Sequence, residues 1–169
     1  MQKPAKTLLW ISMGIGILYA IVALISMIAG GVIHTYGSPD GAVYGIAIMM
    51  YVIKVGIPVV AKIMFAFIII FSLKENSEKI VTEIIAIVLF SGIMLIPSII
   101  IHNVGSILVA NIGNQEALVS YSYMNSSMVW TEFLCNISTV LFIVAVAFSI
   151  AYKKVELTDL HRILEEEDA

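Results

Sequence analysis

The apolar run Tyr51–Phe71 contains two lysines, Lys54 and Lys62. A charge near the centre of a lipid bilayer is costly, so lysines in such runs usually face a bundle interior or a watery cavity. Pro58 lies between them and lacks a backbone N–H, so we expect it to kink the helix. The run therefore predicts a kinked membrane helix whose lysines need polar partners on neighbouring helices.

The rest of the chain offers those neighbours. The whole chain is 60% hydrophobic and only 12% charged, whereas soluble domains average roughly 25% charged residues. We predict an all-α, polytopic membrane protein with four transmembrane helices, because about 20 apolar residues suffice to cross a bilayer. The predicted spans are residues 8–33, 46–73, 80–101 and 128–152. They form a bundle over residues 1–152, followed by a short tail helix over 153–169.

Basic residues indicate the orientation of these spans. The two outer segments, 34–45 and 103–127, contain no Lys or Arg. The remaining segments outside the spans hold Lys3, Lys6, Lys74, Lys79, Lys153, Lys154 and Arg162. The positive-inside rule then places both termini in the cytoplasm. We expect an integral protein of the plasma membrane, with the first span retained because its apolar run is longer than that of a signal peptide.

Small and polar residues share one face of the first span. At ~100° per residue, they fall within roughly 40° of one line: Ser12, Gly16, Tyr19, Ala23, Ser26, Gly30 and His34. Small residues let helix backbones approach closely in lipid. The face predicts helix packing through Ser12, Gly16, Ala23 and Gly30, within the bundle or between copies. A lining for a polar path that ends at His34 is the alternative.

Further polar residues lie on the other three spans and predict a polar core. The set consists of Lys54, Lys62, Ser91, Ser98, Glu132, Asn136 and Thr139. One interpretation is a clamp that fixes how the helices pack, since polar contacts between helices in lipid contribute about 0.6–2 kcal/mol each. The other is a path or binding site. We expect Glu83, about one turn inside the cytoplasmic edge, to reach solvent.

Two specific contacts follow from depth along the helices. If the outer end of the second span lies near Met50, Lys54 is about four residues inside it, and Glu132 is about four residues inside the fourth span, so both are roughly 6 Å deep at 1.5 Å per residue. We therefore predict an ion pair between them. A helix that enters at Ala42 would remove this match. Lys62 lies near the bilayer centre and is expected to point inward, toward Asn136, Ser91, carbonyls near Pro58 or water.

The segments outside the spans carry two weaker predictions. Residues 103–127 are too polar to span and too apolar to lie free, so we expect a helix on the membrane surface or an extension of the third span. In the tail, Leu157, Leu160, Ile163 and Leu164 have helical spacing, and Thr158 is a candidate cap. That helix is either solvated or a docking element for another protein.

Signatures of common enzymes are absent from the sequence. There is no phosphate-binding glycine loop, zinc-protease helix or serine nucleophile elbow, and Cys135 is the only cysteine. We predict no cofactor, and no basic patch suits nucleic acid. A weak alternative is a divalent-metal or hydrolytic site at the outer ends of the spans, formed by His34, Asp40, His102 and Glu116.

These observations favour a channel or transporter component for an ion or small polar solute. A single four-helix bundle has a narrow interior, so we expect it to act as an oligomer in the bilayer. The alternative is a non-conducting accessory or regulatory subunit that binds a larger membrane partner. An outer-face enzyme is the third and weakest interpretation.

Overall fold

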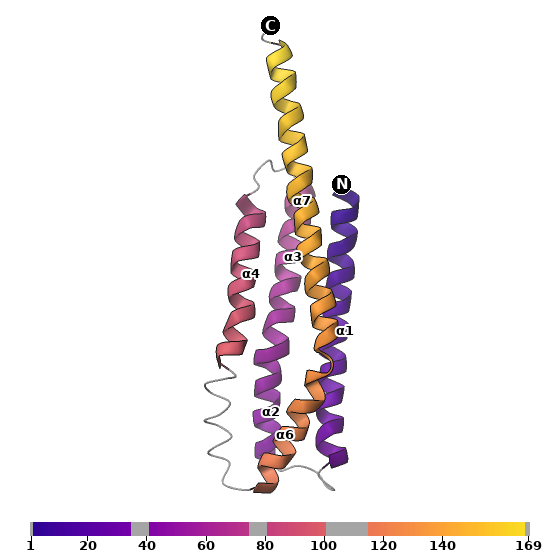
Figure 1. Cartoon of the computed structure of the whole chain (residues 1–169), viewed down its shortest axis with the longest axis vertical. Coiled ribbons are helices and arrows are strands. Elements are labelled where there is room, and N and C mark those ends of the chain that lie inside the picture. Colours follow the sequence, from indigo (N-terminus) through magenta and orange to yellow (C-terminus); the bar gives the residue numbers. More distant parts are fainter. Residues whose placement is uncertain (1, 35–40, 75–80, 101–114, 168–169) are drawn as a thin grey trace.

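A computed structural model describes residues 2–34, 41–74, 81–100 and 115–167. Every element in these ranges is a helix, as the sequence predicts. The helices run side by side along one axis (Figure 1). They are α1 (Gln2–His34), α2 (Gly41–Tyr51), the π-helix η1 (Val52–Gly56), α3 (Ile57–Lys74), α4 (Val81–Ile100), α6 (Gln115–Val129) and α7 (Glu132–Glu167).

Helix α1 is central to the packing. It runs along α6, α7 and α3, while α4 packs on α3 and touches α7. Both chain termini lie toward the same end of the bundle, and α7 continues beyond the other helices at that end (Figure 1). We call this the basic end, because Lys3, Lys6 and Lys153 lie there, and we call the opposite end the far end.

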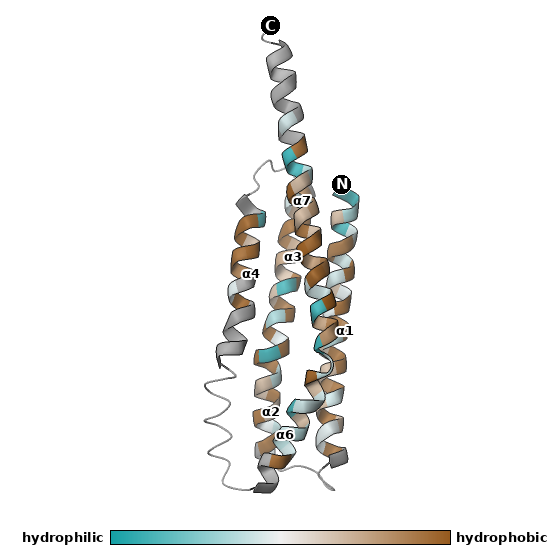
Figure 2. Cartoon of the chain, viewed as in Figure 1, coloured by the Kyte–Doolittle hydropathy of each residue, from teal (hydrophilic) through white to brown (hydrophobic). Residues whose placement is uncertain are grey.

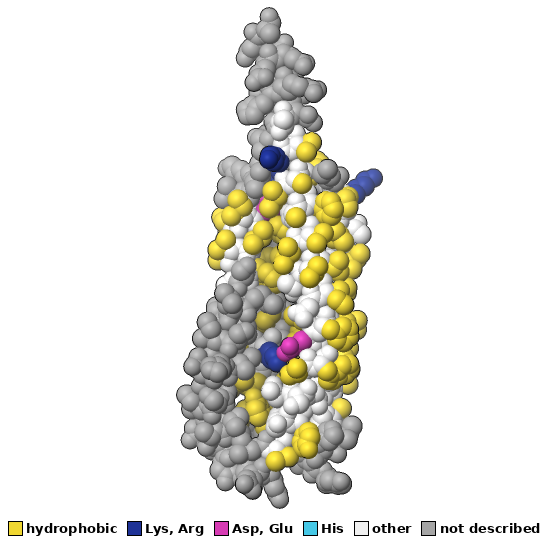
Figure 3. Space-filling view, in the orientation of Figure 1, with side chains coloured by type: hydrophobic (Ala, Val, Ile, Leu, Met, Phe, Trp, Pro, Cys, Tyr) yellow, Lys and Arg dark blue, Asp and Glu magenta, His cyan; other side chains and the backbone are white. Residues whose placement is uncertain are grey.

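The outer surface of the bundle is apolar, as lipid requires. Among the residues that the structure describes, three helical stretches are long and apolar enough to cross a membrane: Gln2–Val32, Val43–Leu73 and Val119–Val155. Hydrophobic residues cover the helices in Figure 2 and much of the described face in Figure 3. Large apolar side chains exposed on this surface include Trp10, Ile25, Val60, Met64, Phe71, Val88, Trp130 and Val140.

The stretch α2–η1–α3 is continuous, and the expected disturbance at Pro58 takes the form of a π-helical turn. The proline ring would clash with the carbonyl of Lys54, four residues earlier, in a regular α-helix. The wider π turn from Val52 to Gly56 precedes it, and the Ile57 N–H donates to the Val52 carbonyl, five residues back. The helix thus passes Pro58 without ending, and it begins at Gly41 rather than near residue 46.

The position of helix α6 differs from both alternatives predicted for the outer segment. Its Tyr121, Met124 and Met128 are buried against Met27 of α1 and Met50 of α2. The part of the outer segment that the structure describes is therefore a packed member of the bundle, neither a surface helix nor an extension of the third span. Residues 101–114 lie outside the described ranges.

A short turn joins α6 to α7, where the sequence predicts an uninterrupted helix from residue 128. Thr131 closes this turn, because its N–H and its hydroxyl both contact the Met128 carbonyl, at 3.0 and 2.6 Å. Beyond it, α7 continues without a break into the predicted tail, as far as Glu167. Thr158 caps no separate helix, since its hydroxyl donates to the Lys154 carbonyl within α7.

The small-residue face of α1 packs inside the chain. Ser12, Ala23 and Gly30 are buried. A Cβ added at Gly30 would lie 2.7 Å from the Ser127 Cβ, and one added at Gly16 would lie 3.4 Å from the Ser138 Oγ. The prediction of close helix contact is confirmed, with α6 and α7 as the partners. Because these residues are covered, this face is not an oligomer contact.

Candidate functional site

Polar side chains meet inside the bundle at three levels. The Lys54–Glu132 pair lies nearest the far end, and the Lys62 cluster (Ser12, Lys62, Ser138 and Thr139) lies next to it. The Glu83 cluster (Ser72, Glu83, Ser149 and Lys153) lies at the basic end. Along α7, Glu132 and Ser138 are about 9 Å apart and Ser138 and Ser149 about 16 Å apart, at 1.5 Å per residue. Helix α7 contributes to every level.

The predicted ion pair between Lys54 and Glu132 is confirmed. Lys54 Nζ lies 2.7 Å from Glu132 Oε1, and the two side chains are 22% and 42% exposed. In Figure 3 a basic and an acidic side chain touch on the described part of this face, with hydrophobic side chains around them. Because both charged side chains are partly exposed on the side of the bundle, a ligand can reach them without unfolding of the bundle.

Both members of this pair lie at interruptions of their helices. Lys54 is part of the π-helix η1, and Glu132 is the first residue of α7, directly after the turn at Thr131. The positive end of the α7 helix dipole favours the Glu132 carboxylate there. π-Helical turns occur frequently at functional sites, and interrupted helices form the binding sites of many transporters.

The ion pair predicts a non-additive effect on stability. We expect Lys54→Met and Glu132→Gln each to lower the free energy of unfolding by roughly 0.6–2 kcal/mol, the range of polar contacts in lipid. The double variant should lose less than the sum of the two, because neither charge is then left alone. Unfolding of purified protein in detergent measures the cycle, with the exposed Lys3→Met as control. Strictly additive losses would contradict a direct interaction.

Lys62 points inward, as predicted, and is only 2% exposed. Its partners differ from the predicted ones: Nζ donates to Ser138 Oγ at 2.8 Å and to Thr139 Oγ1 at 3.1 Å. It also lies 5.9 Å from the centroid of the Phe90 ring. Asn136, one predicted partner, is exposed on α7 instead. A second predicted partner, Ser91, has a side chain outside the described part, and the hydrogen bonds of Lys62 to described residues include no carbonyl near Pro58.

A serine hydroxyl beside a lysine amine has the composition of a Ser–Lys catalytic dyad. The hydrogen bonds oppose that chemistry. Ser138 Oγ donates to the Ser12 carbonyl at 2.8 Å and accepts from Lys62, so its proton is not directed at the amine. Ser138 is also fully buried, beyond reach of a substrate. The cluster ties α1, α3 and α7 together rather than forming a nucleophile.

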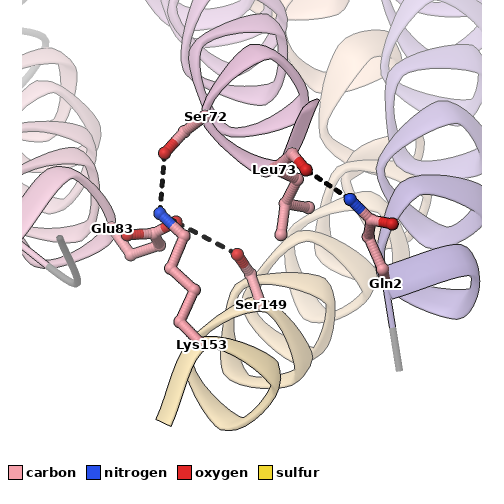
Figure 4. A network of polar contacts seen from close by, with 6 residues as sticks. All are labelled: Gln2, Ser72, Leu73, Glu83, Ser149 and Lys153. Carbon is pink, nitrogen blue, oxygen red and sulfur yellow. Dashed lines mark hydrogen bonds and ion pairs between the residues drawn. The ribbon is translucent and has the colours of Figure 1, made fainter. Parts of the chain in front are cut away.

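The Glu83 cluster corrects another prediction. Glu83 is completely buried rather than solvated, and its Oε1 lies 2.8 Å from Lys153 Nζ. Ser149 donates to the same carboxylate oxygen at 3.1 Å, and Lys153 also contacts Ser72 Oγ at 2.7 Å. Figure 4 shows these side chains converging from α3, α4 and α7. Beside them, Gln2 of α1 donates to the Leu73 carbonyl. The Glu83 cluster therefore holds α4 to the bundle.

Aromatic rings separate the Lys62 cluster from the Glu83 cluster. The Phe90 ring lies 4.9 Å from Phe142 and 6.4 Å from Phe65, between ring centroids. All three belong to an apolar cluster at the basic half of the bundle, together with Leu9, Ile69 and Val146. The polar interior is consequently interrupted here, and a path along it would require these rings to move.

Several candidate residues cannot be placed in this site. The side chains of Ser98, His34 and Glu116, and residues Asp40 and His102, lie outside the described part. Among the described residues, no group of three His, Cys, Asp or Glu is arranged to hold a metal. The sequence does not identify four members of the polar interior: Ser72, Ser138, Ser149 and Lys153. On α7 the last three lie 11 and then 4 residues apart, which places them on one helix face. This pattern crosses the predicted end of the span at residue 152.

No protein-family model, curated protein or solved structure matches this chain.

Proposed function

We propose that the chain crosses the membrane four times, with α4 as the remaining span and both termini in the cytoplasm. The lysines of the basic end support this orientation, since basic residues favour the cytoplasmic side. A reporter fused after Ala169 should be active only in the cytoplasm. Activity of that fusion only outside the cell would reverse the orientation.

We further propose that the protein is a transport or channel component that handles an ion or a small polar solute at the Lys54–Glu132 pair. One observation carries this proposal: two interrupted helices present opposite charges to each other at a laterally open position within the bundle. Charged groups inside membrane spans are usually functional, and discontinuous helices commonly hold transported ligands.

An oligomer is part of this proposal. The interior of one chain is closed by Phe65, Phe90 and Phe142, so a path that involves several copies needs less rearrangement than one through a single bundle. The contact between copies would use exposed apolar faces, such as the one carrying Trp10 and Phe71, rather than the covered face of α1.

Flux measurements test the proposal directly. Purified protein is reconstituted in liposomes loaded with a pH-sensitive or a chloride-sensitive dye, and a potassium diffusion potential is applied. The wild type should pass protons or chloride above the level of empty liposomes, and Lys54→Met and Glu132→Gln should lose that flux. Lys3→Met should retain it. Wild-type liposomes that match empty ones with both dyes would contradict conduction of these ions.

Lys62 provides a separate prediction on the same path. We expect Lys62→Met to remain folded, with stability within about 1 kcal/mol of the wild type, because buried polar groups are often replaced by apolar ones of similar size at little cost. Ser138 and Thr139 keep their bonds to the Ser12 and Cys135 carbonyls. If Lys62 lines the path, the dye-reported flux changes in this variant. Unchanged flux would leave Lys62 as a packing element only.

An accessory subunit is the second candidate, supported by the projection of α7 beyond the bundle (Figure 1). A helix that leaves the membrane as a continuous rod offers a surface to a cytoplasmic or membrane partner. If a neighbouring membrane protein co-purifies, deletion of residues 156–169 should abolish that association. Retention of the partner by the truncated chain would exclude the tail as the contact.

A further inference from the structure

We propose that the Glu83 cluster is a binding site for a monovalent metal cation, Na⁺ or K⁺, and that the Lys153 ammonium occupies it in the conformation seen here. This inference does not rest on solute binding at the Lys54–Glu132 pair, which lies at the far half of the bundle.

Oxygen atoms from three helices converge at this position. Ser72 Oγ of α3 and Glu83 Oε1 of α4 lie 2.7 and 2.8 Å from Lys153 Nζ. Ser149 Oγ of α7 lies 3.1 Å from the same carboxylate oxygen. Carboxylate and hydroxyl oxygens are the ligands that hard cations prefer. The cluster therefore has the composition of a cation site, with an ammonium in place of the metal.

The second carboxylate oxygen of Glu83 distinguishes this site from an ion pair in which every polar atom has a partner. Glu83 Oε2 is buried and has no hydrogen-bond partner among the described residues. A buried acceptor without a partner costs free energy, more so when it is charged. A metal ion that replaced the ammonium could bind both carboxylate oxygens together with the two hydroxyls. Glu83 Oε2 is thus explained as a metal ligand that the Lys153 ammonium does not hydrogen-bond.

Charge balance selects a monovalent ion. Among the described residues, the cluster contains one carboxylate, that of Glu83, and its present occupant carries one positive charge. A monovalent ion would leave the neutral balance of this buried position unchanged, whereas a divalent ion would leave an excess charge in a low-dielectric interior. Binding would release the Lys153 side chain toward the basic end, where its neighbour Lys154 is already exposed.

The native protein gives the first test. Reconstituted wild type is treated with a membrane-permeant amine-acylating reagent in NaCl, KCl or N-methyl-D-glucamine chloride at equal ionic strength. Modification of Lys153 is then quantified by mass spectrometry. We expect acylation of Lys153 to rise roughly twofold or more in Na⁺ or K⁺, because the ion shifts the population toward the released lysine. Modification of Lys154 should be the same in all three salts.

The Lys153→Ala variant gives the second test, since it removes the competing ammonium. Its thermal midpoint should rise by roughly 4 °C or more in Na⁺ or K⁺ relative to N-methyl-D-glucamine, through binding to the folded state alone. Adding Glu83→Gln should abolish that rise. Equal Lys153 acylation in the three salts would overturn the proposal for the native chain. This holds even if Lys153→Ala binds ions, because the oxygens would then accept a cation only in the absence of the lysine.

Discussion

Glu83→Gln is expected to lower the free energy of unfolding by roughly 3–5 kcal/mol, the loss typical of removing one member of a buried ion pair. Lys153 would then keep a charge in a position that is 2% exposed, facing a neutral amide in place of the Glu83 carboxylate. The same change would loosen α4, which this cluster ties to α3 and α7. Chemical unfolding of the purified protein in detergent measures the loss.

The double variant Glu83→Gln/Lys153→Met separates pairing from packing. It should be more stable than Glu83→Gln alone, because no buried charge remains unpaired. Lys154→Met is the matched control, since it removes an adjacent but exposed lysine, and it should leave stability nearly unchanged. A Glu83→Gln variant as stable as this control would show that the buried pair contributes little.

Gly30→Leu is expected to have the second large effect. Even the first carbon of a side chain at this position would lie 2.7 Å from the Ser127 Cβ and 3.0 Å from the Tyr123 carbonyl oxygen. Those atoms belong to α6, so the helix itself must move away from α1. Overpacking of this kind typically costs 1–3 kcal/mol or more. The variant should unfold at lower temperature and lose the contact of α6 with α1.

Leucine substitutions at two other glycines of α1 provide a graded comparison with Gly30→Leu. Gly16→Leu should have a smaller effect, because its nearest neighbour is the Ser138 Oγ at 3.4 Å. Gly14→Leu should have none or a small stabilising one, since nothing lies within 4 Å of that position and leucine is the better helix former. Thermal midpoints that fall equally in all three variants would contradict a contact specific to Gly30.

The Lys54–Glu132 pair was predicted from depth, and it forms, but the helix ends used for the count were wrong. The second span begins at Gly41 rather than near Met50, and α6 precedes α7, so both charges lie farther from the far end than counted. They still meet because both helical stretches extend outward.

The inward direction of Lys62 followed similarly from its depth. Its partner did not, because Ser138 and Asn136 differ by only two residues and face different sides of α7. Which side faces α3 is decided by packing between helices.

Errors arose where the ends of helices were inferred from composition. Lys153 follows an apolar run, so it was assigned to a solvated tail, and Glu83 was left without its partner. Similarly, the polar composition of α6 suggested a surface location, yet Met124 and Met128 bury one of its faces against α1 and α2. In both cases a tertiary contact buries a segment that local composition alone would place in water.

Helix α7 has a mechanical consequence. It carries Glu132, Ser138, Ser149 and Lys153 and extends without a break to Glu167, over roughly 54 Å at 1.5 Å per residue. A force applied to the part of α7 beyond the bundle is transmitted along the continuous helix. Sliding by one helical turn, about 5.4 Å, would displace all three polar levels by the same amount. Rotation of that part of α7 about the helix axis would likewise turn both Lys153 and Glu132 away from their partners.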